Sequence, residues 1–353
     1  MRPFTFPGFV PPLRQCGDVL FSLLTHKTPS VAFFRSVWVL LSLLALCTLS
    51  GCAQLVANQI EQANASVSVT STTDTTATQA IYCSEAMSDC INYLYRPPTV
   101  TPASLQYTVA LTADANQHRQ KTLHLSADWQ GLYRGTVVLI HGQGNNKRSW
   151  LPTMAYFNYL GLHTFAPDLI GHGDSQGARA YGVKDGILIA DFIRQQLAGL
   201  PRPIIVVGHS IGALAAVKAA THTPSIDALA LLAPMRRFDE ATIPVARTYS
   251  PWLSRVISNA TLKAGAELAA LRAGVSLRQT DMLLDIPQLT IPILIYGAAS
   301  DTISNLSMEQ RWHQPNILRV LNENETHLSV VMVGEDEHHA LARLLNQVAG
   351  TNN

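Results

Sequence analysis

Residues 203–216 read PIIVVGHSIGALAA and place three local structures in succession. The first five residues form an unbroken apolar run, typical of a strand buried on both faces. The residues from Ile211 onward are rich in alanine and predict a helix. Between them, Gly208-His209-Ser210-Ile211-Gly212 has the pattern Gly-x-Ser-x-Gly, in which glycines allow a tight turn that lifts the serine above the sheet. Ser210 is therefore a candidate nucleophile.

On both sides of this stretch, short apolar runs alternate with segments of helical character. Continuous apolar runs indicate strands of a parallel sheet that helices cover on both faces. The predicted strands are Thr136–Ile140, Leu162–Ala166, Pro203–Val207, Ile226–Leu232, Ile291–Tyr296 and Ile317–Leu321, and the predicted helices are Trp150–Leu160, Lys184–Leu197, Ile211–Thr221 and Asp336–Ala349. We expect an α/β fold with a mostly parallel, eight-stranded sheet.

Two further segments complete the expected domain, which spans residues 81–353. Leu105–Leu111 and Lys121–Ser126 alternate well enough to predict an antiparallel hairpin at the start of the sheet. The segment 236–287 interrupts the strand–helix alternation and has mainly helical character. We expect it to form a small cap over the carboxyl edge of the sheet, where ligands bind in such folds.

Four stretches resemble the α/β-hydrolase superfamily, in particular its lysophospholipase, monoacylglycerol lipase and esterase-like branches. They are VVLIHGQGNN (137–146), APDLIGHGDSQG (166–177), VVGHSIGALAA (206–216) and IPILIYGAASDTIS (291–304), followed by His327. The resemblance covers roughly residues 105–350. It implies the α/β-hydrolase fold and a serine hydrolase that needs no cofactor and no metal.

A serine hydroxyl needs a base, and the base needs a carboxylate to orient it. In the resembled fold the order along the chain is serine, acid, histidine. Asp301 follows the strand 291–296, and His327 lies in the loop after the last predicted strand, so Ser210, Asp301 and His327 form the expected triad. Asp239, which follows the preceding strand, is the rival acid. The loop Asn324–Leu328 departs from the frequent Gly-x-x-His form.

The resemblance also assigns roles to the loops beside Ser210. It implies that the backbone N–H groups of Gln143 and Ile211 form the oxyanion hole. It makes His141 a structural residue, and His172 part of a turn that shapes the pocket floor. His338 and His339 lie in a predicted helix with neighbouring acids, and a solvated polar face explains them more simply than a metal site does.

Three functions remain open from the sequence. The first is hydrolysis of carboxylic esters, such as a lysophospholipid, a monoacylglycerol or another lipophilic ester. The second is a serine aminopeptidase or amidase, which uses the same triad. The third is a catalytically silent binding protein of the cell envelope, since fold alone does not fix function. The apolar cap residues Tyr249, Trp252, Leu253 and Leu262 either line an acyl pocket or pack the cap on the core.

The N-terminal region is predicted to be a bacterial export signal. The uncharged run Val37–Leu49 follows Arg35, is too short to span a bilayer, and ends in Leu49-Ser50-Gly51-Cys52. This ending resembles the lipobox of bacterial lipoproteins, which implies cleavage before Cys52 and its lipidation; the alternative is a chance match at the end of a buried helix. Residues 1–51 would be the signal peptide, with a true start near Val31 as an alternative to the long leader.

Export would place the protein in the cell envelope. Residues 52–80 are mostly small and polar, which predicts a flexible spacer between the lipid and the domain. Ala53, which is not an aspartate, favours the outer membrane, facing the periplasm. Cys83 and Cys90 are then left as an even pair in an oxidising compartment, either bridged, which we favour, or as two free thiols.

Composition excludes two further classes. Hydrophobic residues make up 47% and charged residues 14% of the 353-residue chain, which excludes disorder of the whole chain. The formal net charge is +1, from 25 basic and 24 acidic residues, and the chain lacks both a basic field and a motif for nucleic acid. The expected partners are an acyl ester and, through the lipid, a membrane. The sequence leaves the oligomeric state open.

Overall fold

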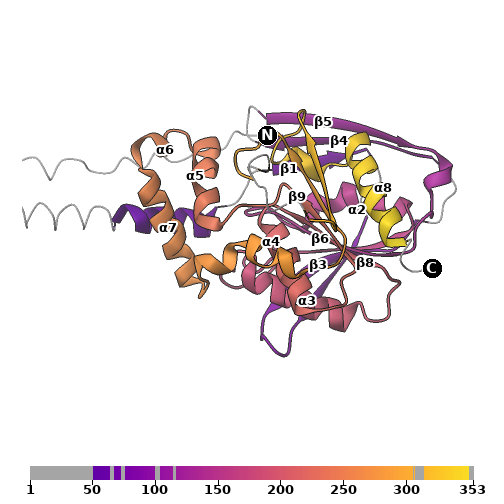
Figure 1. The fold of residues 1–353 in the computed structure, drawn as a ribbon, viewed down its shortest axis with the longest axis horizontal. Helices are drawn as coiled ribbons and strands as arrows, with labels where there is room; N and C mark the ends of the chain where they lie inside the picture. The colour runs from indigo at the N-terminus through magenta and orange to yellow at the C-terminus, as the bar shows by residue number, and fades with distance from the viewer. Residues whose placement is uncertain are drawn as a thin grey trace, which may run out of the picture. The chain divides into compact units, whose positions relative to one another are not determined.

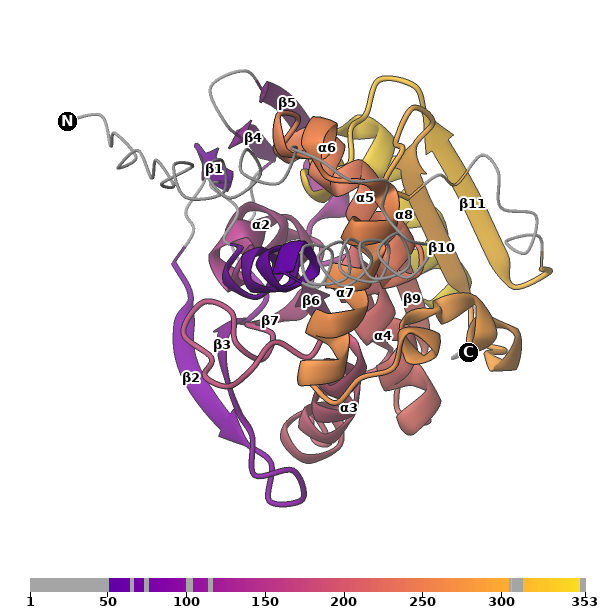
Figure 2. The ribbon, with the colours of Figure 1, turned by 90° about the vertical axis from the view of Figure 1, so that its left-hand side faces the viewer.

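The computed structural model describes residues 51–63, 67–72, 76–99, 104–113, 117–304, 306 and 314–349. Within this part of the chain, eight strands form one sheet in the order β11-β10-β9-β8-β6-β7-β3-β2. The strands are β2 (Thr78–Cys83), β3 (Cys90–Arg96), β6 (Gly135–Ile140), β7 (Leu162–Pro167), β8 (Ile204–His209), β9 (Ala228–Leu232), β10 (Ile293–Ala298) and β11 (Ile317–Asn322). Figure 2 shows β2 and β3 at one edge and β10 and β11 at the other.

All pairings from β7 to β11 are parallel, whereas β2 pairs antiparallel with β3, and β3 antiparallel with β7. Every residue of β6, β8, β9 and β10 is buried, as the continuous apolar runs predict. The prediction of a mostly parallel, eight-stranded sheet with helices on both faces is confirmed.

Two layers of helices cover the sheet. Val138 and Ile140 of β6 point into a core formed with α3 (Val183–Gln196) and α4 (Ile211–His222). Val137 and Leu139 point into the opposite core, with α2 (Leu151–Tyr159) and α8 (Glu335–Ala349). Alternate side chains of one strand thus enter both cores, which is why these strands are apolar throughout.

The hairpin predicted at the start of the large sheet lies elsewhere. β4 (Leu105–Ala113) and β5 (Gln117–Leu125) do pair antiparallel, but they join β1 (Val67–Ser71) in a separate three-stranded sheet. Alternate residues of β4, from Tyr107 to Ala113, are buried in the core that contains α2 and α8. This second sheet therefore forms an outer layer over those helices, as Figure 1 shows.

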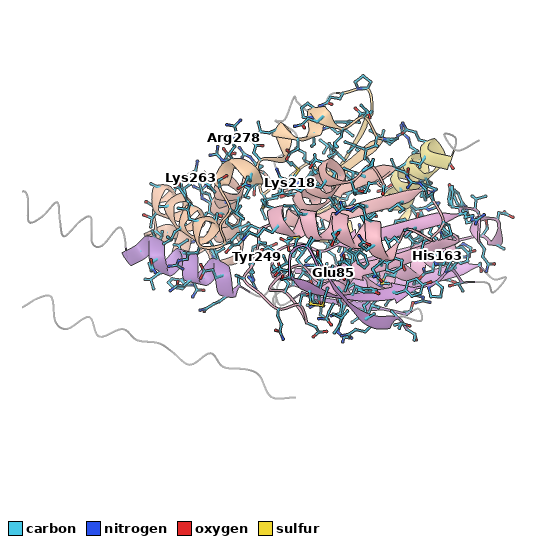
Figure 3. All side chains as sticks on the ribbon, turned by 90° about the horizontal axis from the view of Figure 1, so that it is seen from below. Glu85, His163, Lys218, Tyr249, Lys263 and Arg278 are labelled. Atoms are coloured by element: carbon cyan, nitrogen blue, oxygen red, sulfur yellow. A yellow bond between two sulfur atoms is a disulfide. The ribbon has the colours of Figure 1, made fainter. Side chains whose placement is uncertain are left out.

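β2 and β3 are the antiparallel pair that actually begins the large sheet. The sequence does not show their alternation clearly, because two adjacent hydrophobic residues of β2 face opposite sides: Ile81 is 64% exposed and Tyr82 is buried. A disulfide joins Cys83 and Cys90 across the pair, next to the turn that carries Glu85 in Figure 3. Of the two alternatives for these cysteines, the structure has the bridged one.

The segment 236–287 is a helical cap. It contains α5 (Phe238–Tyr249), α6 (Leu253–Val256) and α7 (Asn259–Arg272), followed by the short 3₁₀ helices η3 (Leu277–Thr280), η4 (Met282–Leu284) and η5 (Ile286–Gln288). Outside the cap, the described residues include the 3₁₀ helices η1 (Ala127–Trp129), η2 (Lys147–Trp150) and η8 (Ser329–Val331). Leu262 is buried, whereas Trp252 is 70% exposed, so the apolar residues of the cap do not share one environment.

The flexible spacer predicted over residues 52–80 is wrong for much of its length. Residues 51–62 are helical, and β1 and the first three residues of β2 also fall in this stretch. Val56 and Ala57 are buried, and a Cβ placed on Gly265 of α7 would come within 2.4 Å of Val56, so the helix packs closely on the cap. Arg272 of α7 also binds Glu61 at 2.9 Å. The apolar residues 53, 56, 57 and 60 recur at helical spacing, a signal that the polar stretch after residue 65 obscures.

The predicted signal peptide lies almost entirely outside the described residues, which begin at Gly51. Cys52 is partly exposed near the start of the 51–62 helix. In the part of the chain that the structure describes, no helix has both the length and the apolar character needed to cross a bilayer.

Candidate active site

Ser210 occupies a strained turn between β8 and α4. Its backbone angles φ and ψ are 54° and −115°, a conformation that residues other than glycine rarely adopt. The flanking glycines are sterically required: a Cβ on Gly208 would lie 2.3 Å from the carbonyl oxygen of Gly212, and one on Gly212 would lie 2.4 Å from that of Ile140. The turn therefore holds the serine in one place above the sheet.

The structure brings the three residues of the expected triad together. The Ser210 hydroxyl lies 3.0 Å from Nε2 of His327, and Nδ1 of His327 lies 2.8 Å from Oδ2 of Asp301. The residues come from the end of β8, the loop after β10 and the loop after β11. His327 can therefore take a proton from Ser210 while Asp301 fixes which ring nitrogen carries hydrogen.

Asp301 is held ionised. Burial alone would raise its pKa, but the hydrogen bond and charge of His327, with further donors from Ser304 and the backbone N–H of Ile303, outweigh it and lower the pKa to about 2. The side chain is almost fully buried. A fixed negative charge at this position stabilises the imidazolium that forms when His327 takes a proton.

The rival acid Asp239 is committed elsewhere. It lies near the start of α5, where Arg237 donates to both of its oxygens, at 2.6 and 3.0 Å. Burial acts to raise its pKa, but Arg237 and Lys263 leave it lowered overall. The structure therefore pairs Asp239 with the cap's own cations, whereas Asp301 contacts the histidine.

The two expected oxyanion donors come from the start of α4 and from the loop after β6. Ile211 is the first residue of α4, so its N–H has no partner within the helix. Gln143 follows Gly142, and a Cβ on Gly142 would lie 2.7 Å from the His209 ring and 3.4 Å from the Ser210 Cβ. The loop that carries Gln143 is thus in contact with the nucleophile's turn. The amide Nε2 of Gln143 is turned toward the carbonyl oxygen of Ile60, at 3.4 Å.

His209 is a residue of the site that the sequence analysis missed. Its Nε2 donates to the backbone carbonyl of His327 at 2.7 Å. Burial lowers the pKa of His209 to about 3, so the ring is neutral and keeps the proton this bond needs. His209 therefore fixes the backbone of His327. Its position beside Ser210 in the sequence was the available signal, but only the fold places it against the His327 loop.

His141 and His172 support the site without contacting the triad. His141 accepts from the N–H of Leu169 at 3.0 Å and donates to the carbonyl of Gly142 at 2.8 Å. His172 donates to the carbonyl of Ile170 at 3.0 Å, and the two rings meet edge to face. Burial lowers the pKa of His141 to about 4 and that of His172 to about 3. Both rings are neutral structural groups that connect the oxyanion loop to the turn after β7.

These buried histidines predict a loss of stability in mild acid. His141, His172 and His209 bind protons below about pH 6.5 when unfolded but only below pH 3 to 4 when folded. The unfolded state therefore binds more protons in this window, and the free energy of unfolding falls as pH decreases, by up to about 1.4 kcal/mol per pH unit for each group. Asp185 acts in the opposite direction, because burial raises its pKa to about 6, but it is one group against three.

Urea unfolding at pH 7.5, 6.0 and 5.0 checks this prediction. We expect the midpoint to fall steadily between pH 6.0 and 5.0 while the slope with urea concentration stays constant. A midpoint that is level or rises across this range would contradict the neutral assignment of the three rings.

The loop that carries His327 is also tied to the outer sheet. Lys121 of β5 lies 2.8 Å from Glu325 and 2.8 Å from Glu337, and both carboxylates are largely buried. Glu337 accepts from the hydroxyl of Tyr296 at 2.6 Å and from the N–H of Gly334 at 2.9 Å. One lysine thus pairs with two largely buried carboxylates, and one of them, Glu325, is two residues before His327.

A second ion cluster, in which Lys147 and Asp168 are buried and Asp174 is half exposed, holds the loop after β6. Lys147 is 1% exposed, and its ammonium lies 2.5 Å from Asp168 and 2.6 Å from Asp174. Asp168 also accepts from the backbone N–H groups of Lys147 and Asp174. These contacts join the loop after β6 to the turn after β7.

Of the two histidines predicted on a solvated polar face, His339 fits the prediction and His338 does not. His338 is buried, with Nδ1 at 3.0 Å from the Tyr156 hydroxyl and its ring against Trp129. His339 is exposed. Among the described residues, no group of three or more potential metal ligands comes together.

A groove of about 530 Å³ opens beside the triad. Its described lining comes from the β4–β5 hairpin, the end of α5 and the two loops that carry the acid and the base: Leu111, His118, Arg119, Thr248, Tyr249, Ser300, Asp301, Thr302, Ile303, Thr326, His327 and Leu328. In Figure 3, Tyr249 marks the end of α5. Asp301 and His327 thus face this groove, whereas Ser210 is not among its described lining residues.

Comparisons with known proteins place this geometry in context. A family described as serine aminopeptidase, S33, matches residues 132–276, which is less than half of the chain. An uncharacterized protein of Mycobacterium tuberculosis is 29% identical over 195 residues, covering 53% of this chain and 47% of that protein. The chain therefore spans about half the length of this relative. A monoglyceride lipase homolog of monkeypox virus is 22% identical over 209 residues, covering 49% of this chain and 73% of the viral protein.

Among solved structures, the alpha/beta hydrolase GrgF from Penicillium sp. sh18 matches with a TM-score of 0.51 and 16% identity. The match covers 77% of this chain and 98% of GrgF. Together with the strand order and the helical layers, it shows that this chain has the α/β-hydrolase fold.

Proposed function

We propose that the protein is a serine hydrolase that cleaves carboxylic esters through an acyl-enzyme on Ser210. The observation that carries the proposal is the unbroken chain of contacts from Ser210 through His327 to Asp301 at the end of the sheet. The serine stands in a strained turn, the base is fixed by His209, and the acid is ionised. Each position of the triad holds a residue competent for its role.

The steps follow from this geometry. His327 takes the proton of Ser210 as its oxygen attacks the acyl carbonyl carbon. The N–H groups of Gln143 and Ile211 then stabilise the oxyanion. The imidazolium gives its proton to the leaving alcohol oxygen as the carbon–oxygen bond breaks. Water, deprotonated by the same histidine, attacks the acyl-enzyme and releases the carboxylic acid and free Ser210.

An amide substrate is the second candidate, because the matching family is described as serine aminopeptidase. Such an enzyme would need a carboxylate to bind the substrate's amine. In the cap, Asp239 is bound by Arg237, and Glu240 lies 3.0 Å from Arg236. Since these two acids already have partners, we favour the ester.

Rates on p-nitrophenyl esters from acetate to palmitate test the proposal, with the chain from residue 52 onward and Ser210→Ala alongside. A start at residue 52 is chosen because the 51–62 helix packs on the cap and should be kept almost whole. We expect turnover that the variant loses, and labelling of Ser210 by a fluorophosphonate. A folded protein that neither turns over esters nor takes the label would instead favour a binding protein.

We further propose that Cys52 carries a lipid that holds the protein at the outer membrane, facing the periplasm. The proposal rests on the sequence around Leu49–Cys52 and on the partial exposure of Cys52. Expression in a Gram-negative host with radiolabelled palmitate is the test. We expect label in the wild type and none in Cys52→Ser, and an unlabelled wild type would contradict the proposal.

A further inference from the structure

The exposed apolar side chains of the domain gather on one part of it. In the described part of the chain, nine large hydrophobic side chains are exposed. Six of them belong to the cap and a seventh, Leu55, belongs to the 51–62 helix that packs on the cap. Single exposed hydrophobic residues are ordinary on a protein surface, but a group of them indicates a surface that a partner covers.

The densest group lies in the segment 245–256, which contains the end of α5 and all of α6. Val245 and Tyr249 are one helical turn apart on α5 and therefore lie on the same side of it. Trp252 directly precedes α6 and is 70% exposed, and Val256 ends α6 and is 76% exposed. Tryptophan and tyrosine are enriched where a bilayer meets water, because their rings combine an apolar body with a polar group.

The charges of the same region are all positive. Residues 241–266 contain Arg247, Arg255 and Lys263 and no acidic residue. Arg247 and Arg255 are exposed, and each lies between two of the exposed apolar residues in the sequence. Such a surface matches a bilayer with anionic headgroups, because apolar side chains enter the acyl boundary while cations stay at the phosphates.

The 51–62 helix runs alongside α7 in the same direction. A Cβ on Gly265 of α7 would lie 3.0 Å from the carbonyl oxygen of Ala53, near the start of the 51–62 helix. Further along α7, Arg272 binds Glu61, near the end of that helix. The first turn of the 51–62 helix therefore lies toward the beginning of α7, the end that follows α6 in the chain. Figures 1 and 2 show the 51–62 helix and α6 at the same end of the domain.

This arrangement determines where a lipid on Cys52 would leave the protein. Cys52 lies in the first turn of the 51–62 helix, and Val56 and Ala57 of the same helix are buried against the domain. Folded chain, rather than a long flexible spacer, thus joins the lipid to the cap. A bilayer that takes up this lipid lies against the end of the domain that carries α6.

We propose that the segment 245–256 is a membrane-docking surface for an anionic phospholipid bilayer. Trp252 and Val256 enter the headgroup region, and Arg247 and Arg255 bind the phosphates. The orientation rests on the proposed lipid at Cys52, whereas the docking itself does not depend on ester hydrolysis. The surface adds a second attachment to that of the lipid and fixes which end of the domain faces the bilayer.

Sedimentation with vesicles tests this surface in a protein that carries no lipid. The protein is the chain from residue 52 onward with Cys52→Ser, which keeps all but the first residue of the compact unit 51–353. We expect it to sediment with vesicles of equal parts phosphatidylethanolamine and phosphatidylglycerol, and more weakly with phosphatidylcholine vesicles. Added salt should weaken binding to the anionic vesicles. Tryptophan emission should shift to shorter wavelength on binding, and Trp252→Phe should remove most of this shift.

Three variants in the Cys52→Ser background locate the surface. Trp252→Ala should lower the partition coefficient about tenfold on both kinds of vesicle, because a large apolar side chain no longer enters the interface. Arg255→Gln should lower it about fivefold on anionic vesicles and leave it unchanged on phosphatidylcholine. Ile81→Thr is the matched control, because Ile81 is 64% exposed but belongs to β2 rather than to the cap. It should bind like its parent, and circular dichroism checks that each variant is folded.

The outcomes separate this inference from the proposed lipid anchor. Failure of the Cys52→Ser protein to sediment with either vesicle, or equal binding by Trp252→Ala, would overturn the docking surface; a palmitate-labelled wild type would then leave the anchor standing. Vesicle binding that Trp252→Ala weakens supports the surface even if the wild type takes no palmitate, in which case only the anchor fails. A dimer that Trp252→Ala dissociates, without vesicle binding, would assign the surface to a second copy of the chain and overturn the inference.

Discussion

Asp301→Asn should lower kcat on a p-nitrophenyl ester about 10⁴-fold without unfolding the protein. The Asp301 carboxylate accepts from Nδ1 of His327 at 2.8 Å, which leaves Nε2 free to accept the Ser210 proton. An asparagine of the same size presents an amide that can donate to Nδ1 instead. The ring then carries its hydrogen on Nε2, the wrong nitrogen for a base, and the imidazolium loses its counter-charge.

Asp239→Asn is the matched control for this experiment. Asp239 is also buried and also ionised, but its partners are Arg237 and Lys263 of the cap. We expect its kcat to stay within a few-fold of the wild type. Circular dichroism and the urea midpoint of both variants show whether either change acts by unfolding. Nearly full activity in Asp301→Asn together with inactivity in Asp239→Asn would exchange the roles of the two acids.

Local pattern was sufficient for the parallel part of the fold. Strands such as β8 are buried on both faces, so their sequence is apolar at every position and needs no knowledge of distant segments. The Ser210 turn is encoded in the same local way, because Gly208 and Gly212 are the residues whose Cβ atoms would clash. The order of acid and base along the chain then follows from the resemblance to α/β-hydrolases.

Long-range packing decided what the sequence could not predict. The β4–β5 hairpin alternates like any hairpin, and nothing in its residues says that β1, some forty residues earlier, is its partner rather than the large sheet. The helix 51–62 is short and borders a polar stretch, so its stability comes from Val56 and Ala57 packing on the cap. The role of His209 likewise depends on a loop 118 residues away.

Lys121→Met should destabilise the fold by about 3–5 kcal/mol, the usual result of removing one partner from a buried ion pair. Lys121 is the cation that meets both Glu325 and Glu337, and its loss would leave two like charges close together and largely buried. Burial already raises the pKa of Glu337, with Lys121 acting in the opposite direction. Urea unfolding at pH 7.5 measures the loss.

The same change should also reach the chemistry, because Glu325 is two residues from His327. The Ser329 hydroxyl donates a hydrogen bond to Glu325 at 2.5 Å and accepts one from the N–H of Thr326. The Glu325 carboxylate is therefore part of the turn that positions His327. We expect kcat to fall while KM changes little, since Lys121 is not among the described lining residues of the groove.

A second change tests the cause. In the Lys121→Met background, Glu337→Gln removes one of the two like charges and should restore part of the stability and part of kcat. As a single variant, Glu337→Gln should lower the free energy of unfolding less than Lys121→Met does. If the double variant is no more stable than Lys121→Met, packing of the lysine stem rather than charge would explain the loss, and the outer sheet would support the active site only by covering it.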